Sequence, residues 1–200
     1  MTISAAQIKE LREATGAGVL DCRKALEVAG GDMEKATAVL REKGLAIAAK
    51  RADRATLSGV IDIYSHGDGR VGVMVELNCE TDFVARTKEF RTFAHELSLQ
   101  VAANSPSYVR PEDVPAEVLD AERRKARELA LAEGKPEKVM DRIIEGRLEK
   151  FYDERCLVRQ AYIRDDAKKV GDLLQETIAS TGENIVIRRF ARWAVGEEIG

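Results

Sequence analysis

The chain has 200 residues, with 32 basic and 35 acidic side chains and a formal net charge of −3. This slight acidic excess and an aromatic content of only 5% disfavour a general nucleic-acid binder, which normally carries a basic surface and aromatic stacking platforms. The hydrophobic content of 44% is sufficient for a buried core, and the length suggests one ordinary domain plus a small one.

Three features of the sequence bear on its location. No stretch approaches the roughly 18 consecutive apolar residues of a membrane span, and the N-terminal segment lacks the basic and apolar regions of a secretory signal. Cys22, Cys79 and Cys156 are far apart and odd in number, which is typical of free thiols in a reducing compartment. We therefore expect a cytoplasmic location.

Residues 1–44 are predicted to form a small domain of three short helices. Ser4 and Gln7 have the spacing of a capping box at the start of the first helix, and Gly16 is expected to end it. Asp32 suits the N-cap of the third helix, which we expect to stop at Gly44. The inward residues of the second and third helices recur at helical spacing; they are Val19, Cys22, Ala25, Leu26, Ala29, Met33, Ala36, Val39 and Leu40.

Residues 45–56 are predicted to be a helical linker, and residues 57–200 an α+β core. The core should open with a hairpin whose strands lie at 59–65 and 70–78 and whose turn spans 66–69. The expected later elements are a helix from Thr87 with Phe90, Phe93, Ala94, Leu97 and Val101 inward, a charged helix from Pro115 to Gly134, a helix opened by Pro136 with Val139, Ile143, Leu148 and Phe151 inward, a strand at 156–163, a helix with Val170, Leu173, Leu174 and Ile178 inward, and a strand at 184–195.

The predicted fold class is α+β, because strands and helices are mixed without a regular βαβ alternation. The sequence also lacks the glycine-rich phosphate-binding motifs of nucleotide-binding enzymes. Its two histidines, His66 and His95, have no companion ligands at metal-binding spacing. We therefore expect no catalytic residues, no cofactor and no metal site of the chain's own.

The segment Cys79–Arg86, which joins a buried strand to a helix, has an unusual composition for a surface loop. It places Phe83 and Val84 beside Asp82. One interpretation is that Phe83 folds back on the helix that follows. The other is that Phe83 is an exposed wedge with a carboxylate next to it, suited to a partner pocket that contains a cation.

Four segments resemble the translation elongation factor Ts family in its compact form, and together they cover nearly the whole chain in order. They are LREATGAGVLDCRKAL at 11–26, ELNCETDFVAR at 76–86, GKPEKVMDRIIEGRLEKFYDE at 134–154 and GENIVIRRFARW at 182–193. The resemblance implies a guanine-nucleotide exchange factor and no enzyme. Such a factor binds elongation factor Tu with GDP, displaces Mg²⁺ and releases GDP so that GTP can bind. The partner is then elongation factor Tu in its GDP-bound and nucleotide-free forms, and the N-terminal domain is UBA-like.

The resemblance also implies two groups of partner-binding residues. The group that dislodges Mg²⁺ from the partner comprises Thr81, Asp82, Phe83 and Val84. The group that docks on the partner's GTPase domain comprises Leu11, Arg12, Val19, Leu20 and Arg23. Helical spacing assigns Val19 to the bundle core as an alternative, whereas Leu20 lies off that stripe and is the better candidate for exposure. Arg23 stands where the family usually has Lys, which keeps the charge but changes its geometry.

Length carries a further expectation. Longer members of the family have a second core subdomain and a protruding coiled coil, and this chain is expected to lack both. Compact members are homodimers, so the resemblance implies a two-fold homodimer here. Ile185, Ile187 and Trp193 of the last strand are predicted to contribute to its surface.

Two other functions remain open at this point. The first is a passive scaffold, in which the helical domain binds a partner and the core only dimerises. The second is an RNA-binding protein that uses the C-terminal arginines. Strand alternation would put Arg188 and Arg192 on one face and Arg189 on the other. The acidic balance disfavours RNA binding, and neither nucleic acid nor membrane is an expected partner.

Overall fold

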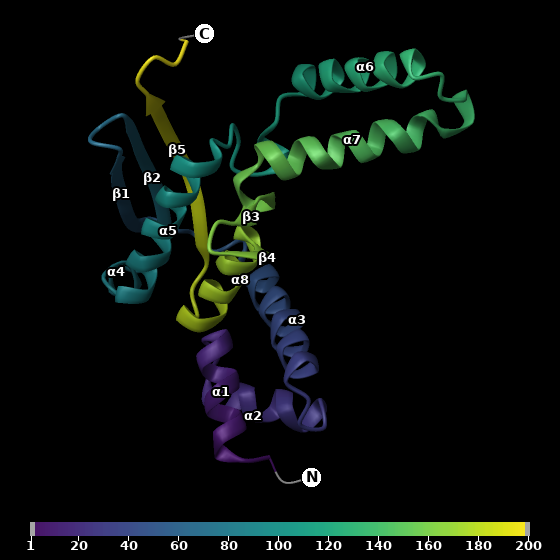
Figure 1. Ribbon diagram of the computed structural model, residues 1–200. Helices are drawn as coiled ribbons and strands as arrows, with labels where there is room; N and C mark the ends of the chain where they lie inside the picture. Colours follow the sequence, from purple (N-terminus) through teal and green to yellow (C-terminus); the bar gives the residue numbers. More distant parts are fainter. Residues whose placement is uncertain (1–2, 199–200) are drawn as a thin grey trace.

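The chain consists of an N-terminal helical bundle, a core built on a small sheet, and a helical hairpin that projects from the core (Figure 1). The structure is a computed structural model and describes residues 3–198. Helices precede and surround an antiparallel sheet, so the predicted α+β class is confirmed.

The bundle contains α1 (Ala5–Thr15), α2 (Val19–Val28) and the first half of α3 (Met33–Arg51). The predicted capping box is present, because the Ser4 and Gln7 side chains each accept the other residue's backbone N–H at 3.2 and 3.0 Å. Its buried centre is small and consists of Leu11, Cys22, Ala25, Leu26 and Ala36.

Helix α3 does not stop at Gly44 as predicted, but continues without a break to Arg51, so the helix predicted within residues 45–56 is present over 45–51. Gly44 is buried against α8 (Val170–Thr181), where a Cβ atom at this position would be in ordinary van der Waals contact with the Cβ of Ala179, at 3.7 Å. Burial against another helix thus outweighs the weak helix propensity of glycine. The division of the chain at residues 44 and 56 stays a prediction.

The core sheet has the order β1-β2-β5 and is antiparallel throughout. Its strands are β1 (Ser58–His66), β2 (Val71–Cys79) and β5 (Ile185–Ala194). Helix α5 (Lys88–Asn104) covers one face, and its predicted apolar stripe is fully buried there. The central strand β2 supplies Val73, Val75 and Leu77 to the same core.

The opposite face of the sheet is exposed and largely apolar. Its exposed large apolar side chains are Ile61, Ile63, Met74 and Trp193. Ile185 and Ile187 point the other way and are buried in the core. The prediction that these two isoleucines contribute to a dimer surface is therefore wrong, whereas Trp193 is exposed.

A β-bulge in β5 changes which arginines share a face. Glu76 pairs with Arg189 and Leu77 with Ile187, which leaves Arg188 without a partner in the ladder. Arg188 is exposed, whereas Arg192 lies opposite buried Val73 with a side chain only 17% exposed. The prediction that Arg188 and Arg192 share a face is therefore wrong, because the bulge shifts the alternation by one residue.

Residues 156–163 are not the single strand that was predicted. They form a 3₁₀ turn at Leu157–Arg159 and the short strand β3 (Ala161–Tyr162), which pairs with β4 (Asp165–Lys169). Cys156 and Leu157 are fully buried within this compact turn. A short apolar run indicates burial but does not by itself distinguish an extended from a turned backbone.

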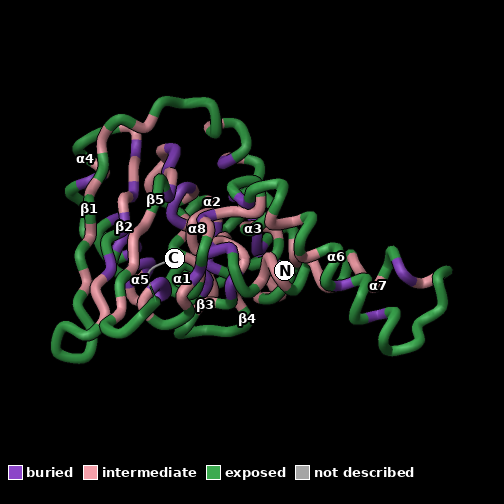
Figure 2. Tube along the Cα trace, turned by 90° about the horizontal axis from the view of Figure 1, so that it is seen from above, coloured by how far each residue is buried: buried purple, intermediate pink, exposed green. Residues whose placement is uncertain are grey.

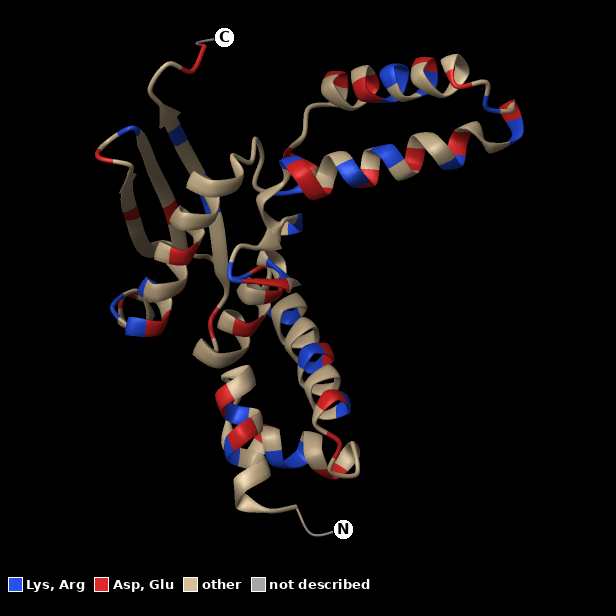
Figure 3. Cartoon of the chain, viewed as in Figure 1, with Lys and Arg blue, Asp and Glu red and all other residues tan. Residues whose placement is uncertain are grey.

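Helices α6 (Ala116–Ala132) and α7 (Met140–Arg155) form an antiparallel hairpin that extends away from the sheet (Figures 1 and 2). Both helices were predicted from the sequence, whereas their joint projection from the core is contrary to the expectation that the chain lacks a protruding coiled coil. Their contact is narrow, with Ala126, Ala130 and Met140 buried, and charges of both signs are interspersed along the outer surfaces (Figure 3). Within residues 3–198, no helix is both long and apolar enough to cross a membrane.

Gly59 is predicted to be essential for the pairing of β1 with β2. A Cβ atom there would lie 2.3 Å from the carbonyl oxygen of Leu77, so Gly59→Ala must push the strands apart. We expect the free energy of unfolding to fall by about 2 kcal/mol or more, measured by urea denaturation. Gly72→Ala is the matched control, because no atom lies within 4 Å of its added methyl group. It should change stability by less than about 1 kcal/mol. Equal stabilities of the two variants would contradict the prediction.

Candidate partner-binding site

The candidate site centres on α4 (Asp82–Ala85), a single helical turn between β2 and α5. This segment was predicted to be a loop. Thr81 caps the turn, since its hydroxyl oxygen accepts the backbone N–H of Val84 at 3.4 Å. Ala85 is buried under the turn and anchors it to the core.

Phe83 projects from this turn into solvent with 82% of its surface exposed. The interpretation in which the ring folds back on the next helix is therefore wrong. Val84 faces the other way and packs partly against the core. Exposing a phenylalanine on a well-anchored turn gains nothing for folding, so this ring is a natural anchor for a partner.

A charged pair stands directly beside the exposed ring. Arg86 donates from Nη2 to the Asp82 Oδ2 atom at 2.7 Å, one helical turn apart, and both side chains are more than half exposed. An exposed ion pair of this kind is weak, so the carboxylate can exchange Arg86 for another cation at little cost. Sequence reasoning missed Arg86; its i, i+4 spacing from Asp82 becomes informative only once the segment is known to be helical.

The second predicted group lies on the bundle and divides by burial. Leu11 is fully buried, whereas Val19 and Leu20 are 53% and 72% exposed, so the core interpretation of Val19 does not hold. The exposed side chain of Arg23 donates from Nε to Glu27 at 2.9 Å. Arg12 and Val19 line a hollow of about 320 Å³ between α1 and α2.

The structure thus brings Arg12 and Val19 together at one hollow of the bundle, with Leu20 next to Val19 on α2, and it places Phe83 on the core. Helix α3 connects the two surfaces, with its first half in the bundle and its second half packed on α8. Both surfaces consist of exposed apolar side chains beside charges. This composition suits protein docking, and it contains no nucleophile paired with a base.

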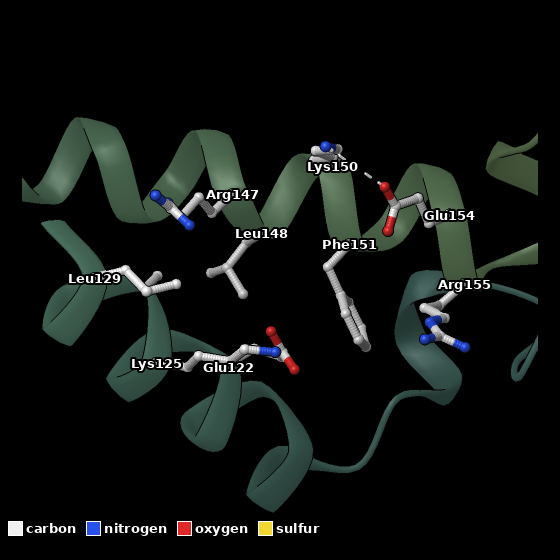
Figure 4. A pocket seen from close by; sticks show the side chains of 10 residues that line it. Glu122, Lys125, Leu129, Arg147, Leu148, Lys150, Phe151, Glu154 and Arg155 are labelled. Carbon is white, nitrogen blue, oxygen red and sulfur yellow. Dashed lines mark ion pairs between the residues drawn. The ribbon is translucent and has the colours of Figure 1, made fainter.

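A second hollow, of about 330 Å³, lies between α6 and α7 of the hairpin (Figure 4). Leu129, Leu148 and Phe151 form its apolar part, and charged side chains surround them. The one ion pair among the drawn residues joins Lys150 to Glu154 at 3.7 Å. The hollow is open and carries no converging catalytic groups. Across residues 3–198, no cluster of three or more His, Cys, Asp or Glu side chains is placed to hold a metal ion.

Comparison with known proteins gives a consistent result over nearly the full length. The sequence model of a family described as "Elongation factor TS" matches residues 4–197. The chain is 61% identical over 197 residues to the protein named Elongation factor Ts from Caldanaerobacter subterraneus subsp. tengcongensis, with 98% of each chain covered. Proteins of the same name from Thermotoga petrophila and Coprothermobacter proteolyticus are 57% and 54% identical over 98% of this chain, and 98% and 100% of their own lengths are covered.

The thiol beside the candidate site is predicted to be unreactive. Burial raises the pKa of Cys79 to about 11, with a further contribution from the charge of Glu183. Burial also raises the pKa of Cys156 to about 11 and that of Cys22 above its usual value. Because the thiolate is the reactive form, a thiol reagent at about pH 8 should label the native protein very slowly.

The control for this measurement is the same protein unfolded in guanidinium chloride, in which all 3 cysteines should react at once. A native thiol that reacts as fast as an unfolded one would show that this part of the core opens readily.

Proposed function

The chain belongs to the elongation factor Ts family, and we propose that it is the guanine-nucleotide exchange factor for elongation factor Tu. In this function it binds elongation factor Tu with GDP, displaces Mg²⁺ and speeds GDP release, after which GTP binds. The observation that carries the proposal is the exposed ring of Phe83, held beside Asp82 on a capped turn in a chain so similar to named family members.

The activity requires coupling between binding events and no covalent chemistry. A protein that binds the nucleotide-free partner better than the GDP form must weaken GDP binding by the same factor. Couplings of this kind are typically 1–3 kcal/mol, or about 5–150-fold in affinity. The chain therefore acts as a binding partner, with no catalytic residue and no cofactor of its own.

The wedge segment, defined as residues 81–84, supplies the displacement step in this proposal. The Phe83 ring enters an apolar gap of the partner, and Asp82 comes to lie near the metal site. There its carboxylate can leave Arg86 and compete with phosphate oxygens for Mg²⁺, which binds oxygen ligands. Thr81 holds the turn, and Val84 fixes it to the core.

The bundle supplies the docking step. Val19 and Leu20 offer apolar contact on the GTPase domain. Arg12 lines the same hollow as Val19, and Arg23 lies one helical turn after Val19 on α2, so each adds a positive charge. Leu11 is fully buried, so it supports this surface from inside and does not touch the partner. Arg23 must release Glu27 to reach a partner group, which costs little at an exposed pair.

A passive scaffold is less well supported, because a scaffold has no need for an exposed phenylalanine on a capped turn. We also propose a cytoplasmic location, where translation factors act, in keeping with three free cysteines.

The first functional prediction concerns Phe83. Phe83→Ala removes the ring but not the turn. The measurement is the release of fluorescent GDP from elongation factor Tu with Mg²⁺ present, and the acceleration by the variant should be smaller than that by wild type by a factor of about ten or more. Leu131→Ala is the matched control, because Leu131 is also an exposed apolar side chain but lies on α6 of the projecting hairpin. It should act like wild type.

The wild-type arm tests the function and the variant arm tests the site. A folded wild-type protein that leaves GDP release unchanged would refute the exchange function and favour the scaffold. Equal acceleration by wild type and Phe83→Ala would keep the function but refute the wedge.

We further propose that the chain is a homodimer that buries the exposed sheet face. Sheets stack through apolar faces, and a two-fold axis would place Ile63 and Trp193 of one protomer against the same face of its partner. The Glu76–Arg189 ion pair, 2.7 Å between Oε2 and Nε, lies on the same face and adds polar groups to it.

The dimer prediction is tested by Ile63→Asp, which places a charge at the centre of this face. The variant should elute as a monomer with its fold intact in size-exclusion chromatography with light scattering, because desolvating the unpaired charge opposes association. Asp68→Asn, in the hairpin turn away from this face, is the control and should leave the mass unchanged. A dimeric Ile63→Asp protein would exclude this face.

A further inference from the structure

The loop between α8 and β5 contacts the start of the wedge segment through the carboxylate of Glu183. Both oxygens of Glu183 accept hydrogen bonds from Thr81. The backbone N–H donates to Oε2 at 3.0 Å and the hydroxyl donates to Oε1 at 2.5 Å. The two residues are 102 positions apart in the sequence. Two bonds from one residue to one carboxylate fix both its position and its orientation.

The hydroxyl of Thr81 passes this restraint on to the turn that carries Phe83. A hydroxyl has one proton to donate and lone pairs with which to accept. The proton goes to Glu183, which turns the oxygen so that it can accept the N–H of Val84. A helix of one turn is too short to persist by itself, so its geometry depends on this cap.

The neighbouring residue connects the same loop to the end of α3. Asn184 is buried, its backbone N–H donates to Glu80 Oε1 at 2.7 Å, and its side-chain amide donates to the carbonyl oxygens of Ala52 and Arg54 at 3.2 and 2.9 Å. Arg54 in turn donates from Nη1 to the same Glu80 Oε1 atom at 3.4 Å, which completes the network. The loop therefore holds both the wedge segment and the helix that carries the docking bundle.

We propose that Glu183 is a positioning residue for nucleotide exchange, and that it fixes the direction in which Phe83 projects. This inference rests on the proposed exchange function. Glu183 touches neither nucleotide nor metal in the proposal and acts only through Thr81. Asn184 joins the restraint to α3, so that wedge and docking surface meet the partner at a set relative orientation.

A contribution to stability does not by itself explain why Glu183 contacts Thr81. The Glu183–Thr81 contacts lie at the surface, where a bond can be exchanged for water, and the core under α4 is held separately by Ala85 and Val84. Loss of the carboxylate should therefore leave the fold intact, but the Phe83 ring should no longer be held in one direction. The expected defect lies in the step that Phe83 performs.

The experiment measures GDP release from elongation factor Tu against concentration for wild type, Glu183→Ala and Glu183→Gln. Glu183→Ala should lower the maximal rate about tenfold, with a change below about threefold in the half-saturating concentration, because docking by the bundle is unaffected. Glu183→Gln keeps one acceptor and should fall between the two. Glu112→Ala is the control; Glu112 is exposed on the core and makes no hydrogen bond or ion pair within residues 3–198.

A double variant separates positioning from a general structural effect. If Glu183 acts through the ring, adding Glu183→Ala to Phe83→Ala should cost less than about twofold more, because the ring to be positioned is already gone. Thr81→Val should reproduce the loss, and Thr81→Ser, which keeps the hydroxyl, should retain the rate. These two variants also serve if Glu183→Ala does not fold.

Each result bears on the proposal separately from the function. A wild-type maximal rate for folded Glu183→Ala, or fully additive losses in the double variant, would overturn the positioning role while the exchange function stands. An inactive wild type would remove the function and the positioning role with it.

Discussion

The packing of α5 against the central strand β2 is the interaction on which the rest of the core depends. Phe90, Ala94 and Leu97 lie on Val73, Val75 and Leu77 with almost no exposed surface on either side. Since β2 is also paired on both edges, this contact fixes the strand end and the helix start together. The residues between Cys79 and Lys88 are therefore held at both ends. A short, exposed turn can therefore be as well placed as the core beneath it.

Much of this architecture could be predicted from the sequence, because the local signals are strong. The capping box of Ser4 and Gln7, the hairpin turn and the five-residue stripe of α5 each combine a clear period with a clear boundary. The α+β class follows from them. Two of the errors have a common cause. The continuation of α3 past Gly44 and the turn at Cys156 and Leu157 depend on which distant surface covers them, and a single sequence does not report that.

The candidate site could be predicted only in part from the sequence. Composition singled out Phe83 and Asp82, but it left two conformations of the ring open, and only the fold excludes one of them. The relation of Arg86 to Asp82 required knowing that the segment is helical. Glu183 could not be found at all, because its importance comes from a contact between segments that are far apart along the chain. Exposed apolar residues are visible in a sequence, whereas the groups that aim them are not.

Helix α3 is a rigid connection whose length sets the distance between the bundle and the core. Its 19 residues correspond to about 28 Å at 1.5 Å per residue, and it is gripped by the bundle at one end and by α8 at the other. One added residue would rotate the bundle by about 100° as well as lift it, since a helical turn takes 3.6 residues. Evolution of this chain can therefore vary loops and surface charge freely. It can change the span between the two binding surfaces only in steps of nearly a whole turn, if both are to face the same partner.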